Sequence, residues 1–291
     1  MNILVTGSNG QLGCEIKDLE KNFTDFRFFF KDLPQLDICK KSQLNAFIKE
    51  NNINTVINCA AYTDVDKAET DSNLAKKINS TGVSNIVNAL EKVDGKLIHI
   101  STDYVFDGNS FLPYDELDYV NPIGVYGKTK RCGELAVINS NIDAIVIRTS
   151  WLYSAYGNNF VKTMLRLANE KNELEVIYDQ VGSPTNACDL AKTCLDILVY
   201  CKNFNINSKG NLYHYSNEGI ASWYDFSKAI MTLGKVNYYV KPIKTKDYPT
   251  NAKRPHFSVL DKSKIKKDFK IEIPYWRDSL EKCILKLNKK S

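Results

Sequence analysis

The stretch Ile3-Leu4-Val5-Thr6-Gly7-Ser8-Asn9-Gly10-Gln11-Leu12-Gly13 decides the fold of this chain. Its apolar start, residues 3–6, is typical of a buried strand that ends at a glycine, and residues 11–20 continue with the spacing of a helix. The stretch therefore predicts a strand, a glycine turn and a helix at the start of the chain.

The glycine turn also predicts a ligand. Glycines allow a tight turn, and the amides at a helix N-terminus can hold a pyrophosphate. The spacing Gly-x-x-Gly-x-x-Gly departs from the Gly-x-Gly-x-x-Gly of dinucleotide-binding folds, and Gly10 could simply relieve a crowded corner. The place directly after an N-terminal strand favours a dinucleotide, held by Gly7, Asn9, Gly10, Gln11 and Leu12.

Apolar runs and helix-like stretches alternate through the first half of the chain. The expected strands are 26–30, 55–60, 96–101 and 144–149, and the expected helices are 41–50, 73–91 and 126–138. Alternation of this kind builds βαβ units, in which a parallel sheet carries helices on both faces. The predicted fold class is therefore α/β, with a doubly wound, Rossmann-like parallel sheet and a second, smaller α/β domain.

The second half is less regular than the first. We expect helices over 159–169, 189–200 and 223–233, strands over 175–178 and 211–215, and Ser222 as the N-cap of the last helix. The pattern changes near Thr149 without a linker of biased composition. We therefore predict an NAD(P)-binding Rossmann domain over 1–150, to whose sheet the segment 187–216 returns, and a mainly substrate-binding domain over 151–291.

The composition narrows the class of protein. The chain has 291 residues, 43% of them hydrophobic, and a net charge of +5, which suits a globular protein with a sizeable core. We see no signal peptide and no apolar run near the roughly 20 residues that span a bilayer, so we expect a cytoplasmic protein without membrane contact. Scattered cysteines and histidines predict neither disulfides nor a metal site, and the basic residues form no nucleic-acid module.

Further cofactor contacts are expected where the second and third strands end. Asp32 lies about 20 residues beyond the glycine turn, where an acidic residue holds the adenosine ribose. Neighbouring Lys31 could instead favour the extra phosphate of NADP, so the choice between NADH and NADPH stays open. Asp37 and Ile38 could reach the adenine, although N-capping of a helix explains Asp37 equally well. Small residues let a cofactor lie against the backbone around Ala60, Ala61 and Tyr62.

The catalytic candidates lie on the fourth strand and on the helix that follows it. Thr102 and Asp103 end an apolar strand, so both should face the crevice, where a hydroxyl can bond a carbonyl oxygen. Tyr126 and Lys130 are helical neighbours that share one face. A tyrosine there can give its proton to that oxygen, and a nearby ammonium would lower its pKa from about 10. Alone the pair could be a surface tyrosine and lysine, but with the other segments it predicts proton transfer beside a nicotinamide.

These residues resemble those of the extended short-chain dehydrogenase/reductases. More narrowly, the chain resembles the dTDP-4-dehydrorhamnose reductases along nearly its whole length. The strings that carry the likeness are GSNGQLG (7–13), AAYTDVDKAE (60–69), STDYVFDG (101–108), RTSWLY (148–153), NNFVKTML (158–165) and DQVGSPT (179–185), together with Arg254-Pro255. The resemblance implies reduction of the 4-keto group of a dTDP-6-deoxy-L-sugar by NADPH or NADH, which gives dTDP-L-rhamnose for polysaccharide biosynthesis.

The resemblance also implies roles for individual residues. Thr102, Tyr126 and Lys130 would form the catalytic trio, and Asp103 would support them. The sugar region would be contacted by Thr63, Val65, Thr102, Asp103, Tyr104, Trp151, Asn158 and Arg254. Ordinary packing is an alternative role for Trp151, and a sugar stacked on its indole is the rival interpretation.

A metal-mediated dimer is a further property of some members of this family. They bind magnesium through glutamates at a dimer interface, and Glu15 matches one such position. The second glutamate is missing, because Cys188 stands there and Asp189 follows. We therefore predict no metal site, and either a monomer or a homodimer.

Related functions stay as alternatives. An epimerase, another keto-reductase or a 4,6-dehydratase acting on a nucleotide sugar would share the fold. Similar dehydratases carry Thr-Asp-Glu, whereas Tyr104 follows Thr102 and Asp103 here, which favours simple reduction. A non-catalytic NAD(P)-binding regulatory subunit is the alternative from another class, because similar proteins regulate methionine adenosyltransferase. The intact Thr102, Tyr126 and Lys130 argue against it.

Overall fold

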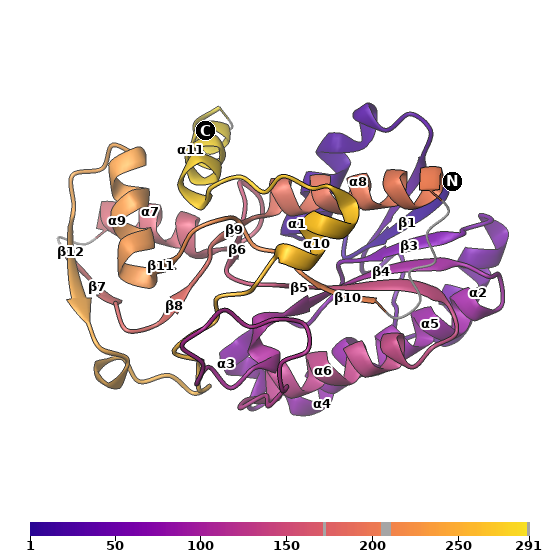
Figure 1. Ribbon diagram of the computed structural model, residues 1–291, viewed down its shortest axis with the longest axis horizontal. Helices are drawn as coiled ribbons and strands as arrows, with labels where there is room; N and C mark the ends of the chain where they lie inside the picture. Colours follow the sequence, from indigo (N-terminus) through magenta and orange to yellow (C-terminus); the bar gives the residue numbers. More distant parts are fainter. Residues whose placement is uncertain (171–172, 205–210, 290–291) are drawn as a thin grey trace.

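A six-stranded parallel sheet forms the centre of the protein (Figure 1). The computed structural model describes residues 1–170, 173–204 and 211–289. The strand order is β10-β5-β4-β3-β1-β2, and every pairing within it is parallel. These strands are β1 (Asn2–Thr6), β2 (Arg27–Lys31), β3 (Thr55–Asn58), β4 (Lys96–Thr102), β5 (Asp143–Thr149) and β10 (Asn211–His214). The carboxyl ends of parallel strands meet at one edge, where ligands bind in open α/β sheets.

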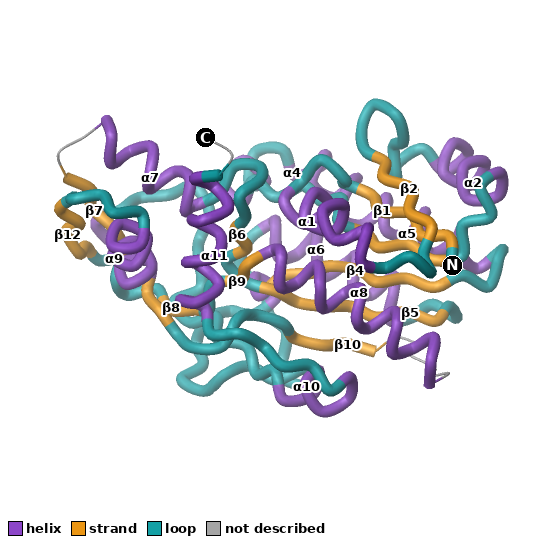
Figure 2. The backbone as a smooth tube through the Cα atoms, turned by 90° about the horizontal axis from the view of Figure 1, so that it is seen from above, coloured by secondary structure: helices purple, strands orange, loops and turns teal. Residues whose placement is uncertain are grey.

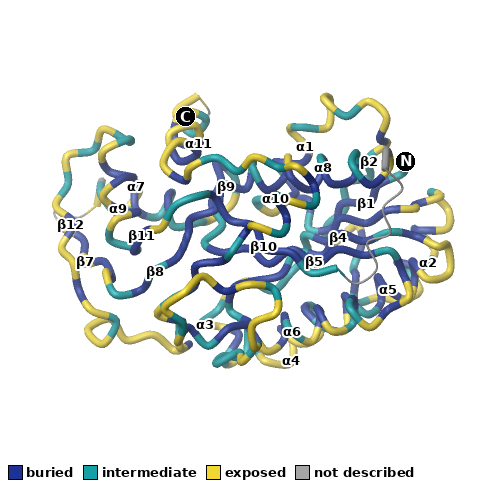
Figure 3. Tube along the Cα trace, viewed as in Figure 1, coloured by how far each residue is buried: buried dark blue, intermediate teal, exposed yellow. Residues whose placement is uncertain are grey.

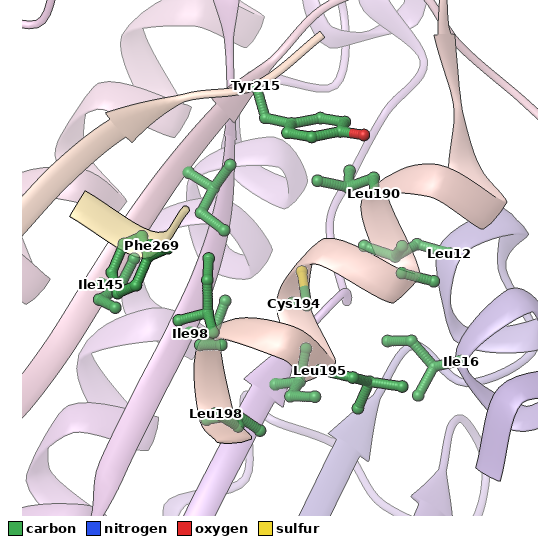
Figure 4. Close-up of a cluster of buried hydrophobic side chains, with 14 of the residues drawn as sticks. Leu12, Ile16, Ile98, Ile145, Leu190, Cys194, Leu195, Leu198, Tyr215 and Phe269 are labelled. Atoms are coloured by element: carbon green, nitrogen blue, oxygen red, sulfur yellow. The ribbon is translucent and has the colours of Figure 1, made fainter. Parts of the chain in front are cut away.

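Helices cover both faces of this sheet (Figure 2). One face packs against α1 (Gln11–Leu19), α8 (Ala187–Phe204) and α10 (Ser263–Phe269). Figure 4 shows Leu12 and Ile16 of α1 facing Leu190 and Leu195 of α8 in this layer. The other face packs against α2 (Lys41–Glu50), α5 (Val83–Glu91) and α6 (Val125–Ile138). The predicted doubly wound α/β fold is therefore confirmed.

A smaller α/β unit lies beyond the carboxyl edge of the sheet, at the left of Figure 1. Its core gathers apolar side chains of α7 (Phe160–Glu170), β7 (Glu173–Ile177), α9 (Trp223–Leu233), β12 (Tyr239–Ile243) and α11 (Trp276–Asn288). β7 pairs with β12 in parallel. Two short pairs complete the unit, β6 (Leu152–Tyr153) with β9 (Thr185–Asn186) and β8 (Val181–Gly182) with β11 (Ala221–Ser222).

Burial follows this two-part architecture. Figure 3 shows the inner strands of the sheet, such as β1 and β4, largely buried and the outer turns of the helices exposed. All of β3 is buried, as is expected for a strand covered by helices on both faces. In the part of the chain that the structure describes, no helix is long and apolar enough to cross a membrane.

Most predicted elements are present, with bounds that differ by a few residues. The helices 41–50 and 223–233 have the predicted bounds, and Ser222 caps the second in a capping box with Asp225. The strand predicted over 55–60 ends at Asn58. The sequence did not predict α3 (Val65–Ala68), α10, α11, β12 or the short strands of the smaller unit. Most of these elements are too short to show a clear period.

One predicted helix is interrupted. The segment 73–91 consists of α4 (Ser72–Lys76), a π-helical turn over Lys77–Gly82, and α5, so a single continuous α-helix was wrong. The π turn holds Asn79, whose side chain accepts from the Tyr62 amide at 2.8 Å and donates to the Thr129 hydroxyl at 3.1 Å. These contacts join residues far apart in the chain, so no local pattern could indicate the interruption.

Candidate active site

A cavity of 660 Å³ lies at the carboxyl edge of the sheet, next to the smaller unit. Most of the predicted site residues line it: Gly7, Gly10, Gln11, Leu12, Asp32, Asp37, Ile38, Ala60, Ala61, Thr63, Val65, Thr102, Asp103, Tyr104, Tyr126, Lys130, Trp151 and Asn158. One cavity therefore brings together the residues that were predicted to hold a cofactor, the reacting atoms and a sugar. The predicted residues outside its lining are Asn9, Tyr62 and Arg254.

The glycine turn forms one end of the cavity. Gly7 has a φ of 62°, and a Cβ there would lie 2.6 Å from the Ala60 nitrogen, so no larger residue fits without a shift of the backbone. A Cβ on Gly13 would lie 2.5 Å from the Ser8 Cα, so α1 packs very close to the turn. No side chain caps the N-terminus of α1, and within the described residues the buried Oε1 of Gln11 has no hydrogen-bond partner. Uncapped amides and an open cradle fit a pyrophosphate.

Asp32 is fixed at the edge of the same end. Its carboxylate accepts hydrogen bonds from the Asn9 amide at 3.0 Å and from the Leu33 amide at 2.8 Å. The Lys31 ammonium lies on the other side of the strand, 5.5 Å from the centre of the Phe47 ring, and Lys31 is not part of the cavity lining. The acidic side chain thus faces the cavity, and the neighbouring lysine does not.

Asp37 caps its own turn by accepting from the Cys39 amide at 2.8 Å, and it also lines the cavity with Ile38. This turn is not the start of a helix: α2 begins at Lys41, and no side chain caps it, so helix N-capping by Asp37 was wrong. Tyr62 faces away from the cavity, because its backbone is held by Asn79 and its hydroxyl donates to Asp71 at 3.3 Å.

The helix α6 is set tightly against the edge of the sheet. Its first amide, at Val125, donates to Glu69 Oε1 at 2.8 Å, which fixes where the helix begins. A Cβ on Gly127 would lie 2.1 Å from the Tyr104 carbonyl oxygen, so a glycine is needed for α6 to come this close. The Tyr126 and Tyr104 rings meet edge to face with centres 5.5 Å apart.

Tyr126 is protonated in this environment at neutral pH. Burial raises the pKa of Tyr126 to about 12, which the Thr102 hydroxyl opposes by hydrogen bonding and the charge of Asp103 reinforces. The predicted lowering of this pKa by Lys130 is not present in this arrangement, because Lys130 Nζ donates to the Ile100 carbonyl oxygen at 2.6 Å instead. Burial lowers the pKa of Lys130 itself to about 8, against the charges of Glu134 and Cys59.

Thr102 and Asp103 form a short hydrogen-bonded unit beside Tyr126. The Thr102 hydroxyl donates to Asp103 Oδ1 at 3.0 Å and accepts from the Tyr104 amide at 3.2 Å. Asp103 is almost fully buried. Burial raises the pKa of Asp103 to about 6, although hydrogen bonds from Ser258 and Thr102 oppose the increase. An ionised Asp103 carboxylate in this buried place lowers the stability of the fold, and groups with such shifted pKa values are common at functional sites.

The smaller unit forms the opposite end of the cavity. Trp151 has a φ of 48°, which is unusual for an aromatic residue, and its indole stacks on Trp223 with ring centres 3.6 Å apart. Trp151 thus packs against Trp223 and lines the cavity as well. Arg254 forms an ion pair with Asp66, whose carboxylate also accepts from the Ala252 amide at 2.9 Å. This pair holds the loop before Pro255 next to α3.

Sequence reasoning missed part of the lining. The additional residues are Thr6, Leu33, Leu36, Cys39, Cys59, Ile78, Ile100, Ser101, Thr149, Ser150, Leu152, Gly157 and Asn159. Those at strand ends, such as Thr6 and Thr149, were available from the rule that ligands bind beyond the carboxyl ends of parallel strands. The others reach the cavity only through tertiary packing.

Glu15, the position that resembles a magnesium ligand, already binds a cation of this chain. It is buried, its Oε2 accepts from Lys286 Nζ at 2.5 Å, and its Oε1 accepts from the Ser154 hydroxyl at 2.6 Å. Lys286 also lies 2.7 Å from an Asp18 oxygen. Among the described residues, no group of three or more His, Cys, Asp or Glu side chains is arranged to hold a metal. The residues around Glu15 therefore do not fit a divalent cation.

Comparisons with known proteins place the chain in a family. The model of the RmlD substrate binding domain matches residues 1–289. A dTDP-4-dehydrorhamnose reductase from Aggregatibacter actinomycetemcomitans is 38% identical over 287 residues, which are 96% of this chain and 97% of the relative.

Solved structures agree with this assignment. A dTDP-4-dehydrorhamnose reductase from Clostridium acetobutylicum ATCC 824 matches with a TM-score of 0.93 and 42% identity, over 99% of this chain and 100% of that one. Another from Bacillus anthracis, in complex with NADP, matches with a TM-score of 0.92 and 36% identity, over 98% and 99%. The chain belongs to the dTDP-4-dehydrorhamnose reductase family.

Proposed function

We propose that this protein reduces the 4-keto group of dTDP-4-dehydro-L-rhamnose with NADPH or NADH, giving dTDP-L-rhamnose for polysaccharide biosynthesis. The observation that carries the proposal is the convergence of Thr102, Tyr126 and Lys130 in a cavity that continues to the glycine turn at Gly7. The relatives named as dTDP-4-dehydrorhamnose reductases support the choice of substrate, and the relative solved with NADP supports the choice of cofactor.

The residues of this chain have separate tasks in that reaction. The bound cofactor supplies a hydride to the keto carbon, and the carbonyl oxygen must receive one proton to complete the hydroxyl. Tyr126 holds that proton at neutral pH because its pKa is raised to about 12. The Thr102 hydroxyl orients the carbonyl oxygen towards Tyr126. Lys130, buried beside them, supplies positive charge for the phenolate that proton transfer leaves behind.

The division of labour between the two halves is also part of the proposal. We assign cofactor binding to residues 1–150 with the segment 187–216, because β10 extends the central sheet beside β5 and α8 packs against α1. Residues 151–291 otherwise supply the sugar end, where Trp151 and Asn158 line the cavity. Arg254 lies outside the lining and is assigned to the sugar through its pair with Asp66 on α3. A cytoplasmic location and the choice between monomer and homodimer stay predictions.

Simple reduction fits this site better than the alternatives. A dehydratase needs an additional acid to eliminate water, and Tyr104, which lines the cavity, stands after Asp103 where similar dehydratases carry glutamate. A regulatory subunit would not need a tyrosine, a buried lysine and a buried threonine gathered around one cavity.

The test is the decay of reduced-nicotinamide absorbance with purified protein, NADPH or NADH, and dTDP-4-dehydro-L-rhamnose, with product identification. Tyr126→Phe should lose at least about 100-fold in kcat, the usual contribution of general acid catalysis, while the Kd for NADPH stays near that of the wild type. The exposed Tyr119→Phe is the matched control and should retain full turnover. Cofactor binding without any turnover in the wild type would favour the regulatory alternative.

A further inference from the structure

Glu134 lies on α6 one helical turn beyond Lys130 and two turns beyond Tyr126. Its side chain is completely buried. Oε1 accepts from Arg148 Nε at 2.8 Å, and Oε2 accepts from Arg148 Nη2 at 2.9 Å and from Arg131 Nη1 at 2.8 Å. Burial opposes ionisation, but the hydrogen bonds and charge of Arg148 hold the pKa of Glu134 below its usual range. Glu134 is therefore a fixed negative charge inside the protein.

Arg148, on β5, is held on its other sides as well. Its guanidinium lies 5.0 Å from the centre of the Phe106 ring, and Nη1 is 3.4 Å from His214 Nε2 on β10. His214 Nδ1 is in turn 3.0 Å from the Tyr114 carbonyl oxygen. Because Arg148 cannot move without breaking these contacts, its bidentate pair with Glu134 ties α6 to two neighbouring strands of the sheet.

Lys130 lines the cavity, and its Nζ donates to the Ile100 carbonyl oxygen of β4, the strand that pairs with β5, at 2.6 Å. The titratable groups that act on it are Glu134 on its own helix and Cys59 after β3, and it acts in turn on His99 of β4. Burial raises the pKa of Cys59 well above its usual value and lowers that of His99, so both are neutral near pH 7. Of these described groups, Glu134 alone carries a fixed negative charge at neutral pH. Without it, a fully buried ammonium would have little to balance it.

We propose that Glu134 is a positioning residue of this active site: anchored by Arg148 one helical turn from Lys130, it keeps the Lys130 ammonium charged in the cavity lining. The link to turnover rests on the proposed function, because it requires that Lys130 act in the reduction. The link to the charge of Lys130 does not, and it can be measured in the absence of any substrate.

The experiment compares Glu134→Gln with the wild type in two measurements. The first is the pH profile of kcat/KM, which reports the essential groups of the free enzyme. Its alkaline limb, set by Lys130 near pH 8 in the wild type, should move to lower pH by about 1 unit when the neighbouring charge is removed. The second is an NMR titration of the Lys130 ¹³Cε signal, assigned with Lys130→Arg, which should move by the same amount.

Glu116→Gln is the matched control. Glu116 Oε1 accepts from the His214 amide at 3.0 Å, so this change alters a carboxylate at the far end of the same network. We expect the Lys130 titration of Glu116→Gln to equal that of the wild type. An equal downward shift in this variant would overturn the proposal, since the effect would then follow any disturbance of the network.

A second variant separates charge from folding. Glu134→Gln leaves the buried Arg148 guanidinium with a neutral amide in place of the carboxylate, and an uncompensated buried charge destabilises proteins strongly. Glu134→Leu combined with Arg148→Met removes both charges and should restore the melting temperature. The Lys130 titration should then fall by less than in Glu134→Gln, because the positive charge of Arg148, which opposes that of Glu134, is also gone. If Lys130 titrates as in the wild type in both variants, the proposal is wrong. If the wild-type protein shows no turnover while Glu134→Gln still shows the expected Lys130 shift, the proposed function alone is refuted.

Discussion

Replacing Gly7 with alanine should destabilise the fold and weaken cofactor binding together. Gly7 has a φ of 62°, and a Cβ added to it would point at the backbone of the segment that follows β3. A Cβ built there would lie 2.6 Å from the Ala60 nitrogen, 2.7 Å from the Ala60 Cα and 2.8 Å from the Cys59 carbonyl carbon. All of these are backbone atoms, so no side-chain rotation can relieve the contact.

The magnitude follows from two terms. The left-handed conformation costs a residue with a Cβ about 1–2 kcal/mol. Forcing an extra methyl group into packed surroundings costs about 1–3 kcal/mol more, because the backbone after β3 has to move. The free energy of unfolding should therefore fall by about 2–5 kcal/mol, a large part of the roughly 5–15 kcal/mol that stabilises a typical domain. The displaced segment carries Ala60 and Ala61, which line the cavity, so the affinity for the cofactor should fall as well.

Denaturant unfolding and fluorescence titration with NADPH would measure the two effects. Gly10→Ala is the matched control for stability, because Gly10 has no positive φ and its Cβ would lie 3.2 Å from the Gly7 carbonyl oxygen alone. We expect this control to lose less than half as much stability as Gly7→Ala. A Gly7→Ala protein with the stability and the NADPH affinity of the wild type would refute the reasoning, since neither strain nor crowding would then exist at the turn.

Other changes test separate parts of the molecule. Asp32→Ala should lower the NADH/NADPH ratio of kcat/KM by about 10-fold, because one charged hydrogen bond to the ribose is lost; an unchanged ratio would remove Asp32 from the ribose site. Burial raises the pKa of Asp103 from 3.8 to about 6, so ionisation of this carboxyl lowers the free energy of unfolding. The loss is absent below about pH 4 and complete above about pH 6. Asp103→Asn should therefore raise the unfolding free energy at pH 7.5 by up to about 3 kcal/mol, and not at pH 4, in denaturant melts; equal effects at both pH values would contradict this. Lys286→Met should lower the free energy of unfolding by roughly 3 kcal/mol, because Glu15 stays buried without its cation, and added magnesium should not restore it. Lys282, exposed on the same helix, is the control, and Lys282→Met should leave the free energy of unfolding unchanged.

The local elements were predictable because their causes are local. The apolar run before Gly7 and the period of α1 follow from neighbouring residues alone. Ser222 and the helix 223–233 were predicted together for the same reason, since a capping box needs only residues three positions apart. The π turn before α5 was missed because Asn79 is held by Tyr62 and Thr129, which local patterns do not connect.

The site was predictable in its residue types and less so in its electrostatics. The spacing of Tyr126 and Lys130 on one helix and the place of Thr102 at a strand end brought them to one cavity, as the sequence indicated. The pKa of Tyr126 went in the direction opposite to the prediction, because burial acts on it and Lys130 is bonded to Ile100. Burial is a property of the whole fold, so residue spacing could not supply it.

The sequence by itself determined the alternation of strands and helices in the main sheet, the glycine turn and the Tyr-x-x-x-Lys pair, because periodicity, turn chemistry and helical spacing act over a few residues. Only the tertiary structure decided which charges meet. The pairs Glu134 with Arg148, Asp66 with Arg254 and Glu15 with Lys286 join segments that are distant in the chain. Such pairs depend on how the layers pack around the sheet, and that packing is a sum over many contacts that no single stretch of sequence contains.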